Sequence, residues 1–231
     1  MSRRPRGFTL IEMAIVLLIV SLLLGGGLSL IGAQAEQQRV KDSQKALDDA
    51  KEALIGYALA NGRLPCPATA ATTGVENPLG GGNCNNSYDG FLPATTLGLP
   101  GTDANGYLTD AWGRPIRYAV TRANGNAATT ANGIRTTTLA TFAPDLRVCS
   151  TATGIAPPNC SGAATTLSNN AVAIILSTGS NPANVNTDET ANQNNDPVFV
   201  SHTPTATFDD QVTWLAPGTF YNRMVQAGAL P

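Results

Sequence analysis

A long apolar run close to the start of the chain limits its structure more than any other feature. Residues 8–33, FTLIEMAIVLLIVSLLLGGGLSLIGA, contain one charged side chain, Glu12. As a helix the run would be roughly 39 Å long, against about 30 Å for the hydrocarbon core of a bilayer. The run therefore predicts a helix that can cross a membrane.

The residues around this run predict its orientation. Three arginines at positions 3, 4 and 6 precede it, and the positive-inside rule keeps them in the cytoplasm, so residues after 33 are expected to be exported. A secretory signal peptide has the same order of segments, and residues 33–35, Ala-Gln-Ala, fit its cleavage site. However, the run exceeds the roughly 7–15 apolar residues of a signal peptide and contains a carboxylate. These departures favour an anchor, and a secreted protein stays the alternative.

Glu12 separates a simple anchor from a more specialised segment. A carboxylate at the centre of a membrane helix costs about 2.5–3.5 kcal/mol on insertion scales and is usually kept for a partner. If the chain is cut after Gly7, the new amino group of Phe8 lies one helical turn from Glu12. It can then neutralise the carboxylate, in the same chain or in a neighbouring one.

The segment Gly7-Phe8-Thr-Leu-Ile-Glu12 after an arginine resembles the class III signal of type IV pilins and type II secretion pseudopilins. In that family a prepilin peptidase cuts between Gly and Phe and methylates the new N-terminus. The resemblance implies that Gly7 precedes the cut, that Phe8 is the methylated mature start, and that Glu12 favours docking against the preceding subunit. It also implies three partners: prepilin peptidase, other pilin or pseudopilin subunits with an inner-membrane assembly platform, and lipid through residues 8–33.

A second helical pattern follows the apolar run. Between residues 34 and 61 apolar side chains recur at steps of three, four and seven, with charged residues between them. Asn61-Gly62 followed by Pro65 predicts the end of the helix. Gly25-Gly26-Gly27 weakens it by about 1 kcal/mol per glycine, which fits either close packing by small residues or local unwinding in a filament.

Four segments follow from these patterns: a leader at 1–7, a transmembrane or filament-core half of the helix at 8–33, an amphipathic half at 34–62, and a periplasmic head at 63–231. The expected fold class is α+β and pilin-like, with the long helix packed on an antiparallel β-sheet head that has long loops. The expected location is the bacterial inner membrane, crossed once with the N-terminus cytoplasmic and the C-terminus periplasmic, and then the assembled pilus or pseudopilus.

Turn-forming residues are dense in the head, so no long helix is expected between Cys66 and Pro217. A last helix at 220–227 is expected, with Thr219 as its cap and Phe220 and Met224 facing the sheet. Strands are predicted at residues 116–121, 134–142, 171–177, 198–201 and 208–215, in a meander-like antiparallel sheet.

Two head segments extend the resemblance. Residues 110–118, DAWGRPIRY, resemble an Asp-x-Trp-Gly-x-Pro-x-x-Tyr segment of the major pseudopilins of type II secretion, which we expect to form a turn with Trp112 and Tyr118 packed on the sheet. Residues 208–214, FDDQVTW, are similar to a C-terminal segment of pilin-like proteins. The insertion at 123–170 departs from the compact pseudopilin pattern and leaves the subfamily open.

The four cysteines allow three pairings, and export favours their oxidation. We predict the local pairs Cys66–Cys84 and Cys149–Cys160, each worth roughly 3 kcal/mol in the chain-entropy model.

The sequence contains few residues or motifs that are typical of an enzyme. The chain has a single histidine, His202, expected to be an ordinary loop side chain, and it lacks G-x-S-x-G, P-loop and dinucleotide motifs. Asp209 and Asp210 are expected on opposite faces of a strand, where they cannot flank one bond.

The head lacks a cluster of basic residues, so nucleic acid is not an expected partner. We predict no enzyme activity, no catalytic residue and no cofactor.

The acidic and amide residues at 181–196, with Asp188, Glu189 and Asp196, and the pair Asp209-Asp210 offer the oxygen ligands that calcium prefers. Pseudopilins of the resembled family bind calcium in a late loop, but the spacing fits neither that loop nor an EF-hand. A solvated loop without a metal is expected.

The predicted function is a structural subunit of a type IV pilus or type II secretion filament; the alternative is a membrane-anchored or secreted periplasmic ligand-binding protein.

Overall fold

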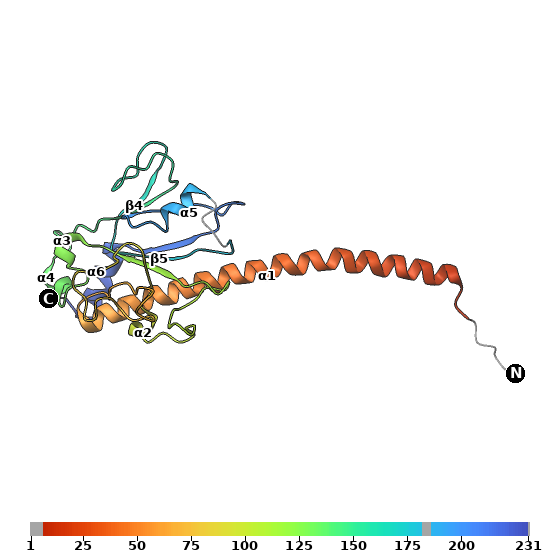
Figure 1. The fold of residues 1–231 in the computed structure, drawn as a ribbon, viewed down its shortest axis with the longest axis horizontal. Helices are drawn as coiled ribbons and strands as arrows, with labels where there is room; N and C mark the ends of the chain where they lie inside the picture. The colour runs from red at the N-terminus through yellow and green to blue at the C-terminus, as the bar shows by residue number, and fades with distance from the viewer. Residues whose placement is uncertain (1–6, 182–185, 231) are drawn as a thin grey trace. The chain divides into compact units, whose positions relative to one another are not determined.

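The computed structural model describes residues 7–181 and 186–230, without the side chains of residues 23–31. The chain divides into two compact units, Met1–Lys41 and Asp42–Pro231. A single helix, α1 (Leu10–Asn61), contributes to both units (Figure 1). The α+β fold class is confirmed, because this N-terminal helix is followed by a head that contains an antiparallel sheet.

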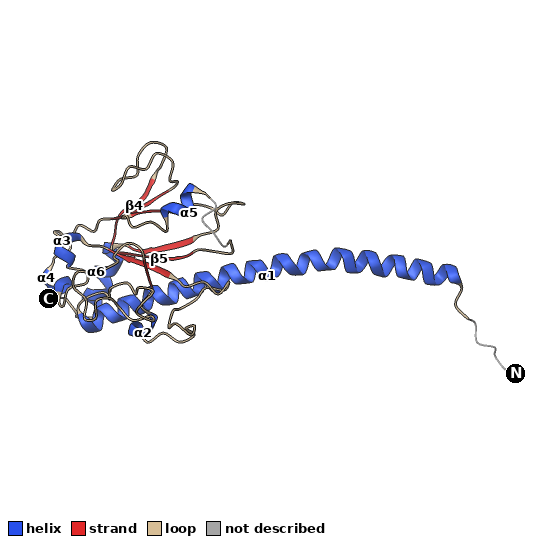
Figure 2. Ribbon diagram, in the orientation of Figure 1, coloured by secondary structure: helices blue, strands red, loops and turns tan. Residues whose placement is uncertain are grey.

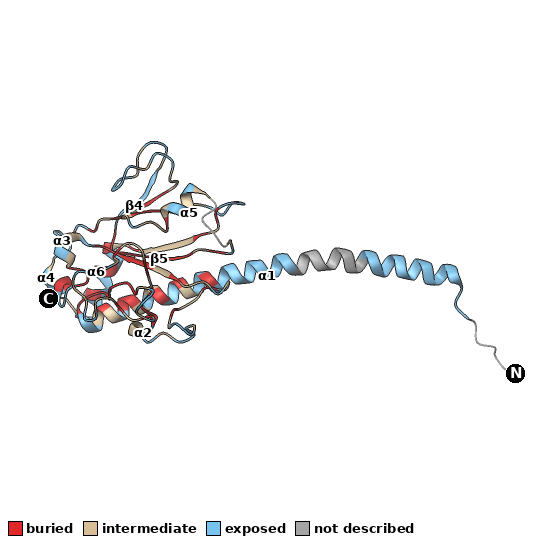
Figure 3. Ribbon diagram, in the orientation of Figure 1, coloured by how far each residue is buried: buried red, intermediate tan, exposed pale blue. Residues whose placement is uncertain are grey.

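In the first unit, the described apolar side chains of α1 are exposed to solvent. The described apolar residues from Leu10 to Leu22 are exposed, and Phe8 before the helix is 83% exposed (Figure 3). Within the described part of the chain, no helix carries a stretch that is both long and apolar enough to cross a membrane. The predicted span at 8–33 includes the side chains of residues 23–31, which lie outside the description, as do leader residues 1–6.

The helix ends where the sequence predicted. Gly62 adopts φ +66°, a left-handed conformation that glycine reaches without strain, and its N–H donates to the Ala58 carbonyl at 2.8 Å.

The main sheet of the head has four antiparallel strands in the order β1-β2-β5-β7 (Figure 2). Three of them confirm predicted strands, although each is shorter than predicted. The strands are β1 (Gly90–Phe91), β2 (Arg117–Val120), β5 (Ala173–Ser177) and β7 (Gln211–Leu215).

The prediction of a simple meander is wrong, because the connections leave the main sheet and build a second one. This sheet has the order β4-β3-β6, from β4 (Thr166–Ala171), β3 (Leu146–Cys149) and β6 (Val198–Val200). Strands β3 and β6 run parallel, so they need a long crossover instead of a hairpin. The insertion at 123–170 supplies two of the three strands.

The predicted strand at 134–142 is also wrong. Residues Gly133–Thr136 form the short helix α4, and turns follow. The threonines of this segment favour a strand locally, but Ile134 and Phe142 are both buried in the core that lies against α1. Tertiary packing therefore decides the structure here.

Alternation along the strands creates two hydrophobic clusters on the two faces of the main sheet. One face, with Tyr118, Val120 and Ile175, packs with α1 residues Leu47 and Leu54. The opposite face contributes Ala119, Ile174 and Leu176 to a cluster with Leu146, Val148 and Phe199 of the second sheet. The head thus has three layers: a helix, the main sheet and the second sheet.

Short helices complete the head: α2 (Ala94–Leu97), α3 (Ala123–Asn126) and α5 (Thr187–Ala191). The last helix, α6 (Pro217–Gln226), buries Phe220 and Met224 as predicted. Thr219 does not cap it, because Ala216 is the N-cap and Pro217 occupies the first turn. Proline is preorganised for that position and has no N–H to satisfy, so the helix starts there.

Candidate functional site

The N-terminal segment of residues 7–12 leads into the first turn of α1. Thr9 lies before the helix, and its hydroxyl oxygen accepts a hydrogen bond from the Glu12 N–H at 3.3 Å. The Glu12 carboxylate reaches back and accepts from the Thr9 N–H at 2.8 Å and from the Thr9 hydroxyl at 2.9 Å. These reciprocal bonds satisfy backbone donors that a helix start leaves without partners.

This arrangement is a capping box, which the sequence analysis missed. Its signal is Thr-x-x-Glu immediately before an apolar run, and Thr9 and Glu12 have that spacing. Glu12 therefore has a second role beside its predicted one. Glu12 helps to start α1, and its carboxylate is directed toward the N-terminal side of the helix, where Thr9 and Phe8 lie.

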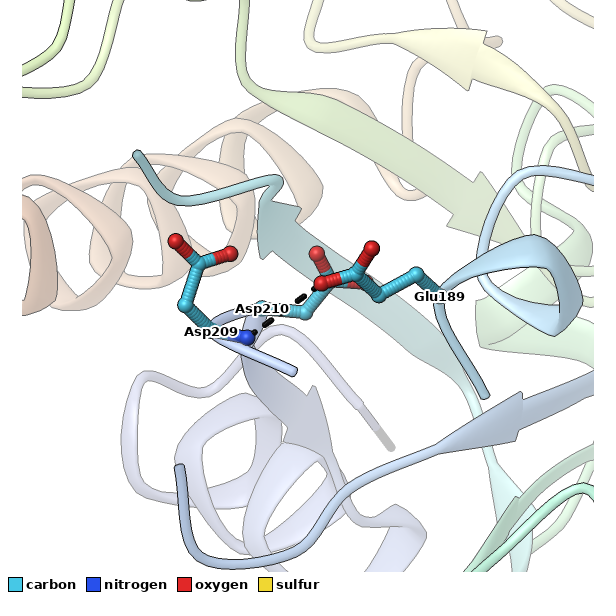
Figure 4. Close-up of side chains that lie close together, drawn as sticks. All are labelled: Glu189, Asp209 and Asp210. Carbon is cyan, nitrogen blue, oxygen red and sulfur yellow. Dashed lines mark hydrogen bonds between the residues drawn. The ribbon is translucent and has the colours of Figure 1, made fainter. Parts of the chain in front are cut away.

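A second group of polar residues meets at the end of the main sheet. Glu189 of α5 and the residues Asp209 and Asp210 before β7 form an acidic cluster, in which one carboxylate oxygen from each lies within 4.8 Å of the others (Figure 4). Asn181 donates to Glu189 at 2.6 Å, and the N–H of Asp209 donates to the same Glu189 oxygen at 3.4 Å.

Two predictions about these acids are wrong. Glu189 is 1% exposed and Asp210 is 4% exposed, so the loop does not leave them in solvent. Asp209 and Asp210 do not alternate across a strand, because β7 begins only at Gln211. Gly179, at φ +66°, permits the close approach, since a Cβ there would lie 2.3 Å from an oxygen of Asp209.

The acidic cluster has unused bonding capacity. Among the described residues, one buried oxygen of Asp209 and one of Asp210 has no hydrogen-bond partner. Burial is the largest effect on Asp210 and raises its pKa from 3.8 to about 7; the charges of Glu189 and Asp209 act in the same direction, against Asn192 and Arg117. Three hard oxygen donors at this separation can hold a divalent cation or share a proton.

The four cysteines and His202 of the head make contacts that stabilise the fold. Both predicted disulfides, Cys66–Cys84 and Cys149–Cys160, are present. His202 is more than a loop side chain: its ring stacks on Phe208 with centroids 3.8 Å apart, and its Nε2 lies 3.1 Å from Asp188. These contacts give it a packing role.

The similarity of this chain to known proteins lies at its N-terminus. Residues 2–28 match the family model of the prokaryotic N-terminal methylation motif. These residues therefore carry a prepilin-type N-terminal methylation signal, which supports the resemblance to type IV pilins and pseudopilins. No curated protein and no solved structure gives a significant match to it. The match covers the prepilin-type signal alone, so the roles of head residues rest on their geometry.

The segment that resembled major pseudopilins forms a tight turn in the head. The Asp110 carboxylate accepts from the Trp112 and Arg114 N–H groups, each at 2.9 Å, and from the Ser177 hydroxyl at 2.6 Å. Tyr118 is buried as predicted, whereas Trp112 is half-buried and belongs to neither hydrophobic cluster. The segment therefore joins the turn to the end of β5 by hydrogen bonds.

Asp210 should make the stability of the head fall as the pH rises. Its pKa is about 7 when folded and near 3.8 when unfolded, so between these values the folded chain binds more protons. This contributes a loss of up to about 1.4 kcal/mol per pH unit. Asp210→Asn should remove that slope and be more stable than the native chain at pH 8. Denaturant unfolding with a chelator present, at pH 5 to 8, measures the difference.

The exposed Asp48, changed to Asn, is the matched control and should leave the slope unchanged. If the native chain and Asp210→Asn show parallel stability curves, the carboxyl does not titrate in this window. A rise in stability on adding Ca²⁺ at pH 8, absent from Asp210→Asn, would show that a cation replaces the proton.

Proposed function

We propose that this chain is a structural subunit, a pilin or pseudopilin, of a type IV pilus or a type II secretion filament. The match of residues 2–28 to the N-terminal methylation motif supports the proposal most directly. The geometry agrees with it, because Glu12 lies in the first turn of a helix whose described apolar side chains are exposed in the isolated chain. So much apolar surface requires lipid or other subunits around it.

In this proposal, the precursor crosses the bacterial inner membrane once through residues 8–33, with its head in the periplasm. Prepilin peptidase cuts after Gly7 and methylates Phe8, and the assembly platform then transfers the helix from lipid into the filament. Acyl chains are as apolar as leucine, so this transfer gains little hydrophobic free energy. Packing and the pairing of Glu12 with the Phe8 ammonium must therefore select the neighbour and the register.

Processing provides the direct test. The mature chain should begin at Phe8, carry one added methyl group and lack the three arginines of the leader. Intact-mass analysis of the membrane fraction, in cells with and without prepilin peptidase, measures this start. A chain that begins at Glu36, after Ala35, would contradict the proposal and favour a secreted periplasmic protein.

A further inference from the structure

The single histidine of the chain, His202, lies where separate segments of the head meet. It follows β6, and its ring stacks on Phe208, which precedes β7. Its Nε2 atom lies 3.1 Å from one carboxylate oxygen of Asp188, in the first turn of α5. The His202 and Asp188 side chains are 23% and 17% exposed, so water screens this contact only in part.

Both ring nitrogens of His202 face hydrogen-bond acceptors. Nδ1 lies 2.8 Å from the carbonyl oxygen of Thr203, and Nε2 faces the carboxylate of Asp188. A neutral imidazole carries one N–H and can donate to one of these oxygens, whereas the imidazolium donates to both. The neutral ring would place a nitrogen lone pair against an oxygen lone pair. The hydrogen bonds around His202 are therefore those of the protonated ring.

The surroundings of the ring also favour a positive charge. Phe208 is fully buried, and its centroid lies 3.8 Å from that of the His202 ring with 26° between the two planes. A cation over an aromatic face is attracted to it. Residues 149–160 and 201–208 contain no lysine, arginine or acidic side chain. The ionisable side chains of the adjoining segments are all acidic: Asp188, Glu189, Asp209 and Asp210.

Asp188 extends this contact to the disulfide loop, residues 149–160, which the second disulfide closes. Its other carboxylate oxygen accepts from the Ala152 N–H at 2.5 Å and from the Thr151 hydroxyl at 3.1 Å. Hydrogen bonds from such donors favour the ionised carboxylate, so the proton between Asp188 and His202 belongs on the ring. One carboxylate thus joins the disulfide loop to His202.

We propose that His202 is a proton-dependent latch, whose imidazolium holds the connection between β6 and β7 to α5 and, through Asp188, orders the disulfide loop. Histidine is the side chain that ordinarily changes its charge between about pH 5 and pH 8. The latched form binds one proton more than the released form, so the latch is closed in acid and opens as the pH rises. This inference goes beyond the proposed function and does not depend on it.

Hydrogen exchange of the Ala152 amide measures the latch, because this N–H donates to Asp188. The full-length chain in detergent micelles is followed by NMR at several values from about pH 5.5 to pH 8. Protection factors, which remove the intrinsic effect of pH on exchange, should fall at least about fivefold at Ala152 over this range. The Ile175 amide in β5 reports unfolding of the whole head. Asp210 titrates in the same range, so the series is repeated with Asp210→Asn, where Ile175 should keep its protection.

The protonation of the ring is observed separately. Labelling of histidine with 15N gives the signals of one ring, because the chain has one histidine. Both ring nitrogens should carry a proton at about pH 5.5 and one of them at about pH 8. The loss of protection at Ala152 should have the same midpoint as this change, because the same proton controls both.

Two variants isolate the charged contact. His202→Phe keeps an aromatic ring over Phe208 but has no N–H, so Ala152 should show at every pH the low protection that the native chain has at about pH 8. In Asp188→Asn, the side-chain oxygen still accepts from Ala152 and the amide donates to a neutral ring, so protection should not fall as the pH rises. Asp48→Asn, on the exposed face of α1, should behave like the native chain.

Three results would overturn the proposal: constant protection of Ala152 from about pH 5.5 to pH 8, a fall that persists in His202→Phe, or a fall whose midpoint differs from that of the ring. Protection of Ile175 equal to that of the native chain shows that a variant is folded, so the change at Ala152 is then local.

Discussion

Replacing Glu76 by glutamine should lower the free energy of unfolding of the head by about 3–5 kcal/mol, because it leaves a buried charge without its partner. The Glu76 side chain is 4% exposed and that of Arg63 is 9% exposed. Arg63 donates to both oxygens of Glu76, at 2.8 and 2.7 Å. The backbone N–H groups of Cys66 and Gly80 donate to the same carboxylate, each at 3.1 Å.

The pH dependence of this loss follows from the pKa of Glu76. Burial alone raises that pKa, but the bonds from Arg63 and from two backbone N–H groups outweigh it and hold the pKa below the usual value. The stabilisation is therefore fully present above the unfolded pKa and is lost as the pH falls through the folded one. Denaturant unfolding at pH 7 and in acid should show that the deficit of Glu76→Gln shrinks in acid.

Glu52 provides a matched control. Arg223 donates to both of its oxygens, at 2.8 and 2.7 Å, so the bonding resembles that of the buried pair. The two side chains are 47% and 60% exposed, however, and solvent replaces a lost partner there. Glu52→Gln should change the free energy of unfolding by less than about 1 kcal/mol. Equal losses for the two variants would mean that burial does not set the strength of these pairs.

The sequence predicted best the elements whose signal is local. Asn61-Gly62 ends α1 because glycine can take the left-handed conformation that follows a helix. The apolar residues of β5 are buried on both faces, which is what an uninterrupted apolar strand requires. Phe220 and Met224 lie four residues apart and share the buried face of α6.

Strand β6 of the second sheet confirms the predicted strand at 198–201, but the other two strands of that sheet could not be predicted in the same way. Strand β4 lies at the edge of its sheet and is largely exposed. Its sequence, Thr-Leu-Ser-Asn-Asn-Ala, shows neither an alternation of apolar and polar residues nor a run of apolar residues. Strand β3 is four residues long and includes Arg147. Their pairing depends on partners elsewhere in the chain, so local propensity carries little of the information.

The buried polar groups are hidden for a related reason. The side chains of Glu189 and Asp210 lie close together although 20 residues lie between them in the sequence. Arg63 lies before the loop that the Cys66–Cys84 disulfide closes, and it donates a hydrogen bond to Glu76 inside that loop. Composition shows that such residues exist, but only the fold shows which of them share a site. The capping box was the opposite case, since Thr9 and Glu12 are three residues apart and their pattern is readable in the sequence.

If the chain is a filament subunit, the largest functional effect is expected at Glu12. Glu12→Val should reduce the amount of this chain in sheared filaments at least about tenfold, while its amount in the membrane fraction stays the same or rises, because the carboxylate opposes insertion. The ratio of the two fractions, measured by quantitative immunoblotting, is the readout. Glu36→Gln is the control, since Glu36 is an exposed acid on the same helix with a weak contact to Arg39 at 3.7 Å.

Glu12→Gln separates the capping role that Glu12 has in the structure from its proposed role in assembly. Glutamine can keep the capping box with Thr9, because its side-chain oxygen still accepts from the N–H and hydroxyl groups that now donate to Glu12. It cannot balance the charge of a Phe8 ammonium. If the charge selects the neighbouring subunit, glutamine and valine should fail alike, whereas normal assembly of glutamine alone would assign the effect to the start of the helix. Normal assembly of both variants would leave a simple membrane anchor as the better account of residues 8–33.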